Sequence, residues 1–133
     1  MPTFTSAAIS DTVNDCVEAE NGAGFSTSAA LNCISSTNVA ICQHVGLYFA
    51  GVTVPQGRAI TAAYIQVKPT VGGDDPNLNI YINDVDNAAN FTDSADIRSR
   101  AYTTANALWE AANLGTTAYV NSPSLTTVVQ DFV

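Results

Sequence analysis

Basic residues and long apolar runs are scarce in this chain of 133 residues, and each scarcity argues against a class of function. Four Lys plus Arg residues stand against 12 Asp plus Glu, for a net charge of -8. Phosphate binding needs clustered basic side chains, so this balance argues against a nucleic-acid partner. No stretch reaches the ~18 apolar residues of a membrane span. The amino-terminal sequence has neither a basic nor an apolar segment of the kind found in signal peptides, so we expect synthesis in the cytoplasm without export.

Histidine is also scarce, because His44 is the only one in the chain. A Ser-His-Asp triad would need His44 as its base, but the G-x-S-x-G elbow of one large class of such enzymes is absent. Glycoside hydrolysis needs two carboxyl groups at a defined separation. Among 12 acidic residues some close pair is almost inevitable, so its presence would discriminate nothing. We therefore predict a protein that is not an enzyme and has no cofactor.

The three cysteines, Cys16, Cys33 and Cys42, allow at most one internal disulfide and leave at least one thiol. None of them forms a C-x-x-C pair. Cys42 and His44 are the only Cys and His close together in the sequence, whereas a structural zinc site usually has four such ligands. We interpret all three cysteines as small buried hydrophobic residues. Cys33 and Cys42 would lie near each other if a hairpin joins them, and their disulfide state stays open.

Acidic residues gather over residues 74–96, a run without Lys or Arg. Carboxylates in such a run are the hard oxygen ligands that Ca²⁺ prefers. The segment NDVDN at 83–87 comes nearest to a calcium loop and offers Asp84 and Asp86 as ligands. It lacks the D-x-[DN]-x-[DN]-G spacing of such loops. We therefore interpret the run as a solvated acidic loop rich in Asx turns, and we predict no metal site.

The chain is rich in apolar side chains at alternate positions, and this pattern predicts strands. Residues 45–54 and 60–69 flank a Pro-Gln-Gly turn, and LNIYIND at 78–84 alternates most regularly. Residues 8–20 suggest an earlier strand pair, and residues 100–109 a later strand that ends in a Trp at the margin of the core. The inward positions of the clearest strands predict this core: Val45, Leu47, Phe49, Ile65, Val67, Leu78, Ile80 and Ile82.

The last twelve residues have a helical pattern instead. Ser122 is a candidate N-cap and Pro123 a candidate first helical residue. The following apolar residues recur at helical spacing: Leu125, Val128, Val129 and Phe132. Short strands with one terminal helix predict an all-β fold, specifically a β-sandwich of jelly-roll type with one short C-terminal helix. We expect one domain over residues 1–133, with residues 1–7 as an N-terminal arm.

Four segments of the chain resemble an all-β, jelly-roll-like module that recurs in tailed-phage virion proteins and bacterial cell-surface proteins. They are VGLYFAGVTVPQGRAITAAYIQV, DVDNAANFT, SRAYTTANALW and SLTTVVQDFV, and the similarity covers residues 41–133. Such modules resemble carbohydrate-binding modules in architecture, but no binding residues carry over. They usually continue past SLTTVVQDFV into further strands, whereas this sequence stops at Val133. We therefore expect a sheet edge that can pair with another chain.

Tyrosines supply the candidate binding residues. Tyr48 and Tyr81 lie opposite the inward sets of their strands, and Tyr102 belongs to a third predicted strand. Such side chains can stack on sugars, and they are equally suited to protein interfaces, where Tyr is enriched. We take Tyr48, Tyr81 and Tyr102 as candidate interface residues.

The resemblance to phage proteins favours a non-catalytic virion structural protein, most specifically a capsid decoration (cement) protein that stabilises a tailed-phage head. Its partners would be the major capsid protein and copies of itself, on the capsid surface of the virion. The alternative is a carbohydrate-binding or adhesion module of a surface or tail-associated protein. A decoration protein should form symmetric multimers, whereas a carbohydrate-binding module should be a monomer with a groove lined by two or three aromatic residues.

Overall fold

The computed structural model describes residues 15–19, 24–27, 43–70, 77–93, 95–111, 115 and 118–133. In this part of the chain the fold is β-rich, with short strands and little helix. The residues group into two compact units, one formed by Met1–Thr53 and Asn87–Arg100, the other by Val54–Asp86 and Ala101–Val133. The predicted arm at 1–7, Cys33 and Cys42 lie outside the described residues. The single domain stays a prediction.

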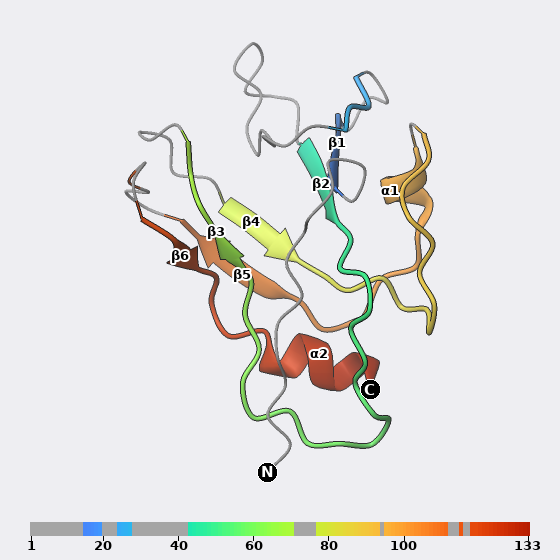
Figure 1. The fold of residues 1–133 in the computed structure, drawn as a ribbon, viewed down its shortest axis with the longest axis vertical. Helices are drawn as coiled ribbons and strands as arrows, with labels where there is room; N and C mark the ends of the chain where they lie inside the picture. The colour runs from blue at the N-terminus through green and yellow to red at the C-terminus, as the bar shows by residue number, and fades with distance from the viewer. Residues whose placement is uncertain are drawn as a thin grey trace. The chain divides into compact units, whose positions relative to one another are not determined.

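The first unit is built on an antiparallel strand pair, β1 (Asp15–Ala19) and β2 (Gln43–Leu47), which lie side by side in Figure 1. Their register sets Cys16 opposite Gly46 and Glu18 opposite His44. On its other edge, β1 exchanges two backbone hydrogen bonds of 2.9 and 3.0 Å between Val17 and Ser26. β1 therefore has backbone hydrogen-bond partners on both of its edges.

A long loop that contains α1 (Asp96–Ser99) packs on this strand pair. Ile97 of this single helical turn is buried, and so are Cys16 and Glu18 on the strand beneath it. The sequence pattern predicted no helix here, because one turn is too short to show an apolar period. The buried centre of the first unit therefore includes a carboxylate and a thiol, and it is not made of the predicted Val and Leu positions alone.

The second unit contains two antiparallel ribbons, both visible in Figure 1. One pairs β3 (Gln66–Val67) with β6 (Val120–Asn121), and the other pairs β4 (Asn77–Ile80) with β5 (Ala107–Glu110). In the second ribbon, Leu78 lies opposite Trp109, and Asn79 opposite Leu108. The alternation predicted for β4 is confirmed, because Leu78 and Ile80 are half-buried while Asn77 and Asn79 are exposed.

The terminal helix α2 (Thr126–Phe132) is confirmed, but it begins later than the sequence predicted. Ser122 caps no helix, because its hydroxyl instead accepts the Ile65 N–H at 3.0 Å and donates to the Pro123 carbonyl at 2.8 Å. The apolar residues predicted from the helical spacing do point inward. Leu125 and Val128 are buried, and the other two members of the pattern are half-buried.

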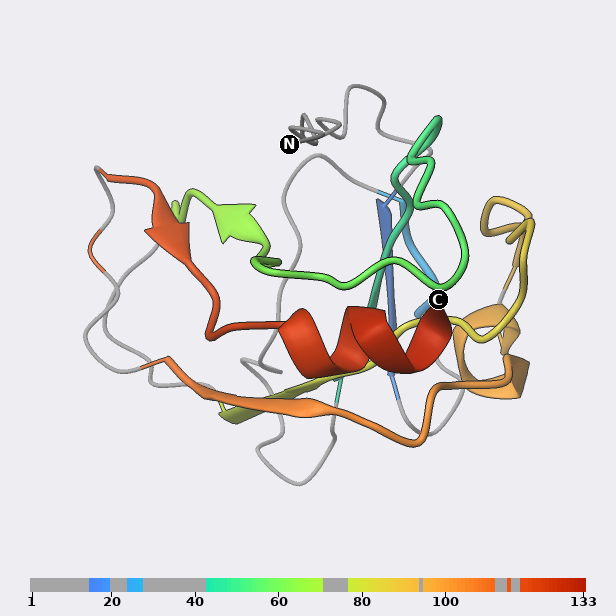
Figure 2. The ribbon, with the colours of Figure 1, turned by 90° about the horizontal axis from the view of Figure 1, so that it is seen from below.

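Side-chain hydrogen bonds hold α2 between two segments of its own unit, an arrangement visible in Figure 2. On one side, Gln130 accepts the Ile60 N–H at 2.9 Å and donates to the Arg58 carbonyl at 3.2 Å. On the other side, Asp131 accepts the Ala105 N–H at 3.0 Å. These contacts give backbone groups of Arg58, Ile60 and Ala105, which lie outside the β-ladders, hydrogen-bond partners within the fold.

The predicted core needs correction in two respects. All eight of its residues are half-buried, and none reaches the burial of the true centre. The buried hydrophobic residues are Cys16, Ile97, Trp109, Ala111, Leu125 and Val128. Trp109, expected at the margin, is only 8% exposed. A residue on a two-stranded ribbon has few neighbours across the sheet, so alternation marks its inward face without guaranteeing full burial.

Some predicted strands are shorter than expected. Residues 52–54 and 60–65 belong to no β-ladder of the described chain, and within 100–106 Tyr102 forms an isolated bridge to Asn83. In the described part of the chain, no helix is long and apolar enough to cross a membrane.

Candidate functional site

Three large side chains are exposed on the outward side of the segments that form and extend the β4–β5 ribbon: Tyr81, Tyr102 and Leu108. We call them the tyrosine patch. Their exposed fractions are 45%, 40% and 54%, respectively. The rings of Tyr81 and Tyr102 lie 5.8 Å apart between centroids at an interplanar angle of 44°, a tilted aromatic pair. Of the three predicted interface residues, the structure therefore brings two together.

Local backbone pairing brings the two rings together. Beyond β4, the chain continues antiparallel to residues 101–103, where Asn83 bridges Tyr102 and the Thr103 N–H donates to the Ile82 carbonyl at 3.0 Å. The Thr103 hydroxyl accepts the Ile82 N–H at 3.2 Å and reinforces this pairing. Because Ile80 and Ile82 are the less exposed positions, strand alternation turns Tyr81 outward. The patch thus depends on contacts between segments about twenty residues apart.

Leu108 was missed in the sequence. Its neighbour Trp109 is buried, so alternation along ALWE turns Leu108 to the opposite face of the ribbon. The alternation along ALWE is visible in the sequence, but it identifies Leu108 as outward only once Trp109 is known to point inward. Tyr48 is not part of the tyrosine patch. It lies in the first unit, just after β2, and is half-buried.

Two further tyrosines of the second unit are exposed, Tyr64 by 59% and Tyr119 by 67%. The Lys68 ammonium lies 5.9 Å from the centroid of the Tyr119 ring, within the range of a cation–π contact. Tyr64 lines a hollow of about 260 Å³ together with small and polar side chains. The lining residues are Thr61, Ala62, Ala63, Tyr64, Asn121, Ser122, Ser124 and Thr126.

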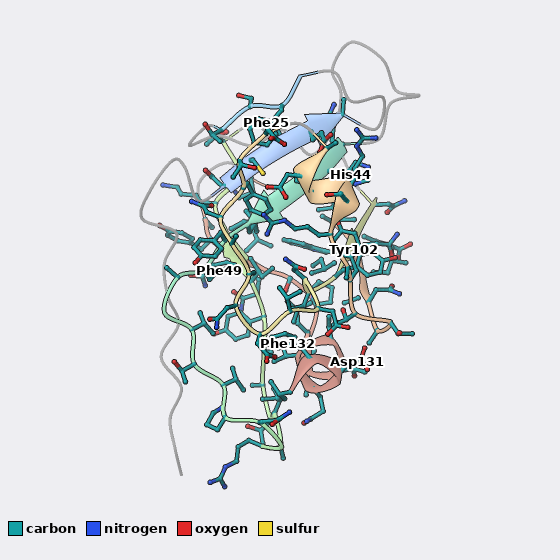
Figure 3. The ribbon with its side chains drawn as sticks, turned by 90° about the vertical axis from the view of Figure 1, so that its right-hand side faces the viewer. Phe25, His44, Phe49, Tyr102, Asp131 and Phe132 are labelled. Carbon is teal, nitrogen blue, oxygen red and sulfur yellow. The ribbon has the colours of Figure 1, made fainter. Side chains whose placement is uncertain are left out.

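A second hollow, of about 390 Å³, lies beside α2 and is lined by Ala105, Thr126, Thr127, Gln130 and Asp131. Asp131 is labelled with Phe132 on α2 in Figure 3. The first hollow has one aromatic residue in its lining, and the second has none. Neither hollow therefore has the two or three aromatics expected of a groove that binds a carbohydrate.

Two acidic residues, Asp84 and Asp86, follow β4 in the same unit as the tyrosine patch. The Asp84 N–H donates to the Ala101 carbonyl at 2.9 Å, which places Asp84 beside the residue that precedes Tyr102. Asp84 and Asp86 are both exposed. In the described part of the chain, they belong to no group of three or more His, Cys, Asp or Glu that could hold a metal ion. They therefore act here as surface charges.

The first unit contains a buried charged cluster that serves packing. Glu18 is fully buried, and its Oε1 accepts hydrogen bonds from the Ala95 N–H and from Nε and Nη2 of Arg98, each at 2.9 Å from the guanidinium. His44, labelled in Figure 3, lies opposite Glu18 in the register and is half-buried. This cluster attaches the loop before α1 to β1, a connection that the sequence did not reveal.

The thiol of Cys16 lies in the same unit and is fully buried and free. Burial raises the pKa of this thiol from 9.0 to about 11. A thiol with such a pKa is protonated near neutral pH and is a poor nucleophile, because the thiolate is the reactive form. Cys16 therefore acts in this structure as a small buried hydrophobic residue.

A second ion pair joins two residues of the loop that contains α1. Nε and Nη2 of Arg100 donate to the two carboxylate oxygens of Asp96 at 3.0 and 2.9 Å. Hydrogen bonds from Arg100 hold the pKa of the Asp96 carboxyl below its usual value. The Arg100 guanidinium carbon also lies 4.3 Å from the centroid of the Phe91 ring. Arg100 thus packs against an aromatic ring and pairs with a carboxylate at the same time.

No model of a known protein family matches this chain, and neither a curated protein nor a solved structure matches it.

Proposed function

We propose that the protein is a non-catalytic structural protein of a tailed-phage virion, and specifically a capsid decoration protein bound on the outside of the shell. The observation that carries the proposal is the tyrosine patch. Tyr81, Tyr102 and Leu108 together expose large amphipathic and apolar surface on one side of a ribbon. Tyrosine is enriched in protein interfaces because its ring supplies contact area while its hydroxyl tolerates water. The resemblance to a module of phage proteins supplies the virion as the setting.

The proposed fold is a β-sandwich of jelly-roll type. Three antiparallel ribbons and a closing helix supply the elements of such a fold. In this interpretation, the short ribbons are parts of larger sheets, and the half-buried residues of β3 and β4 face the space between the sheets. A rigid sandwich would present the tyrosine patch to a neighbour without a large cost in conformational entropy.

The major capsid protein is the principal partner in this proposal, with contacts between copies of the decoration protein as a second interaction. A net charge of -8 on every copy makes neighbouring copies repel each other at low ionic strength. The shell should therefore supply most of the binding energy. Symmetric clusters of copies would then follow the symmetry of the shell.

The alternative is a carbohydrate-binding or adhesion module, and Tyr64 is its strongest support, since this ring lines a hollow rich in hydroxyl groups. A single ring offers one stacking platform. Sugar-binding grooves of the expected kind use two or three, and the other aromatics of the second unit do not line this hollow. The structural observations favour a protein partner over a glycan.

The test is to purify particles of the phage that encodes this chain and to count copies of the protein by quantitative mass spectrometry after salt washes. A decoration protein should remain in a fixed ratio to the major capsid protein. Particles that lack it should release DNA at a lower temperature or after a milder osmotic shock, because a ligand that binds only the intact shell stabilises it. A protein that is monomeric, absent from washed particles and retained by a polysaccharide would contradict the proposal.

A further inference from the structure

We infer that the outward face of the β3–β6 ribbon of one copy of this chain binds the acidic turn at residues 84–86 of a second copy. The inference deepens the proposed function, because it identifies a contact between copies, and it rests on that function only for the virion as its setting. Five exposed side chains form the outward face of the ribbon, which we call the ribbon face. They are Tyr64, Gln66, Lys68, Tyr119 and Asn121.

Backbone pairing gathers these side chains into one surface. The register pairs Gln66 with Asn121, and their side-chain amides are hydrogen-bonded at 3.0 Å, so both lie on the same side of the ribbon. The pairing continues beyond β3, where the Ser122 N–H donates to the Ile65 carbonyl at 2.8 Å. Exposure alternates over residues 64–68, with positions 64, 66 and 68 exposed and the two between them half-buried. The exposed positions therefore share the side on which Gln66 lies.

A cation lies over an aromatic ring at one end of the ribbon face. The Lys68 ammonium lies 5.9 Å from the centroid of the Tyr119 ring. Tyr119 is 67% exposed, and Tyr64 is 59% exposed. Lys68 forms no ion pair among the residues that the structure describes. An ammonium group has three hydrogen-bond donors, so this one can bind a carboxylate while it stays over the ring.

The ribbon lies in the part of the sequence that lacks negative charge. Residues 54–73 and 111–130, which contain both strands and the segments that flank them, include Arg58 and Lys68 and no Asp or Glu. The whole chain has 12 Asp plus Glu and a net charge of -8. The ribbon is thus a locally positive region of an acidic protein, and charge complementarity favours an acidic surface as its partner.

The same chain has such a surface. Asp84 and Asp86 are both exposed, and Val85 between them is 43% exposed. Residues 77–86 contain no Lys or Arg. Neither of the two carboxylates forms an ion pair in the described part of the chain. The turn therefore offers two unmatched charges to Lys68 of another copy and an apolar side chain to its tyrosine rings.

Backbone hydrogen bonds hold the acidic turn in place. The Asp84 N–H donates to the Ala101 carbonyl at 2.9 Å. The Val85 N–H donates to the Asn83 carbonyl, also at 2.9 Å. A turn that is already ordered loses less conformational entropy on binding than a free segment would.

The contact is heterologous, because the ribbon face and the acidic turn are different surfaces. Heterologous contacts repeat head to tail, and they close into a ring or continue as a chain. A ring would be the symmetric multimer expected of a decoration protein. The net charge of -8 makes whole copies repel. At an ionic strength of about 0.15 M the Debye length is ~8 Å, so salt screens this repulsion more than it screens charges in direct contact.

The experiment is sedimentation velocity of the full chain over a range of concentrations at about 0.15 M ionic strength. We expect oligomers that grow with concentration. Lys68→Glu should weaken association about fivefold or more, and so should the double variant Asp84→Asn/Asp86→Asn. The double variant makes the chain less negative, so general repulsion between copies predicts the opposite result, a stronger association. Circular dichroism checks that each variant is folded.

Matched controls separate the contact from overall charge. Arg58→Glu makes the same charge change as Lys68→Glu, in an exposed residue outside the ribbon face. Asp93→Asn/Glu110→Gln removes two other exposed carboxylates. Association of both controls should stay within about twofold of the original protein, or strengthen in the second.

A mixing experiment tests the heterologous geometry. Lys68→Glu keeps an intact acidic turn, and Asp84→Asn/Asp86→Asn keeps an intact ribbon face. An equimolar mixture of the two proteins retains one complete contact for each pair of molecules. The mixture should therefore form dimers and nothing larger.

Several results would overturn the inference. They are a chain that stays monomeric at every concentration, equal effects in test and control variants, and an oligomer that Tyr81→Ala dissociates while Lys68→Glu leaves it intact. A monomer whose Tyr119 NMR signals shift when a polysaccharide is added would identify a glycan as the occupant and would overturn it too. If the contact is found but the protein is absent from particles, the proposed function fails and the inference stands. If the protein is in particles but Lys68→Glu associates like the original, the inference fails and the proposed function stands.

Discussion

The sharpest structural prediction concerns Gly46→Ala, because Gly46 lies directly under the Phe91 ring. A methyl group on Gly46 would lie 2.7 Å from Cε1 and 2.8 Å from Cε2 of Phe91, and nearer still to Cζ. Carbon atoms in proteins do not approach so closely, so either the ring or the strand has to move. The ring is not free to move, because the Arg100 guanidinium packs against it and is itself hydrogen-bonded to Asp96 and to two backbone carbonyls.

The magnitude follows from two opposing effects. Forcing an extra carbon into a packed site costs typically ~1–3 kcal/mol. Replacing Gly by Ala inside a strand returns roughly 0.5–1 kcal/mol, because the unfolded chain loses conformational freedom. The two terms combine to a loss of roughly 0–2.5 kcal/mol, and because the ring is held in place we expect Gly46→Ala to lower the free energy of unfolding by about 1–2 kcal/mol within that range. For a chain of this size, each kcal/mol lowers Tm by roughly 2–8 °C.

Urea denaturation followed by circular dichroism measures this loss, and a double-mutant cycle with Phe91→Ala identifies its cause. In the Phe91→Ala background the methyl group has room, so Gly46→Ala should become neutral or slightly stabilising. The matched control is Gly115→Ala, because a Cβ at Gly115 meets nothing within 4 Å. An equal loss in both backgrounds would refute the steric explanation and with it the placement of Phe91 over β2.

Four other predictions concern stability and assembly. Val128→Ala should lower the free energy of unfolding by about 1–3 kcal/mol, and more than Val129→Ala does, because Val128 is 1% exposed and its neighbour is only half-buried. A urea titration of both variants compares them, and equal losses would contradict the placement of α2. Between pH 9 and 11 the Cys16 thiol ionises first in the unfolded chain, so stability should fall with rising pH, by up to roughly 3 kcal/mol. Cys16→Ala should lack this component, and identical alkaline profiles of the two proteins would refute it. The Asp96 carboxyl, whose folded pKa is lowered, should stabilise the fold above its unfolded pKa and lose that contribution as the pH falls through the lowered value, so Asp96→Asn should flatten the acid limb of the stability profile. Deletion of residues 1–7 should lower the occupancy of the protein on particles, measured by mass spectrometry, and full occupancy with unchanged heat resistance would count against an N-terminal tether.

Local pattern predicted several features of this protein well. The alternation of Leu78 and Ile80 with asparagines predicted both a strand and its inward face, because side chains on a strand point to opposite sides in turn. The spacing of Leu125 and Val128 predicted the terminal helix in the same way. Alternation also turned Tyr81 outward. These features depend on residues within a few positions of one another, so the sequence alone contains the information.

Other features arise from contacts between residues far apart in the chain. Nothing in the local sequence marks Glu18 for burial, yet it is fully buried, because Arg98, 80 residues later, supplies the matching charge. Ser122 looked like an N-cap, but Ile65 uses its hydroxyl, and the helix starts later. No local pattern can reveal a partner that folding brings from elsewhere.

The candidate binding surface combines both kinds of information. Tyr81 could be chosen from the sequence as an outward aromatic, and Tyr102 as an aromatic of a predicted strand, because alternation and composition are local properties. Only the tertiary structure brought their rings to 5.8 Å, added Leu108 from the paired strand, and placed Tyr48 in the other unit. The reason is physical: a strand pattern determines which way a side chain points, whereas strand pairing determines which side chains become neighbours.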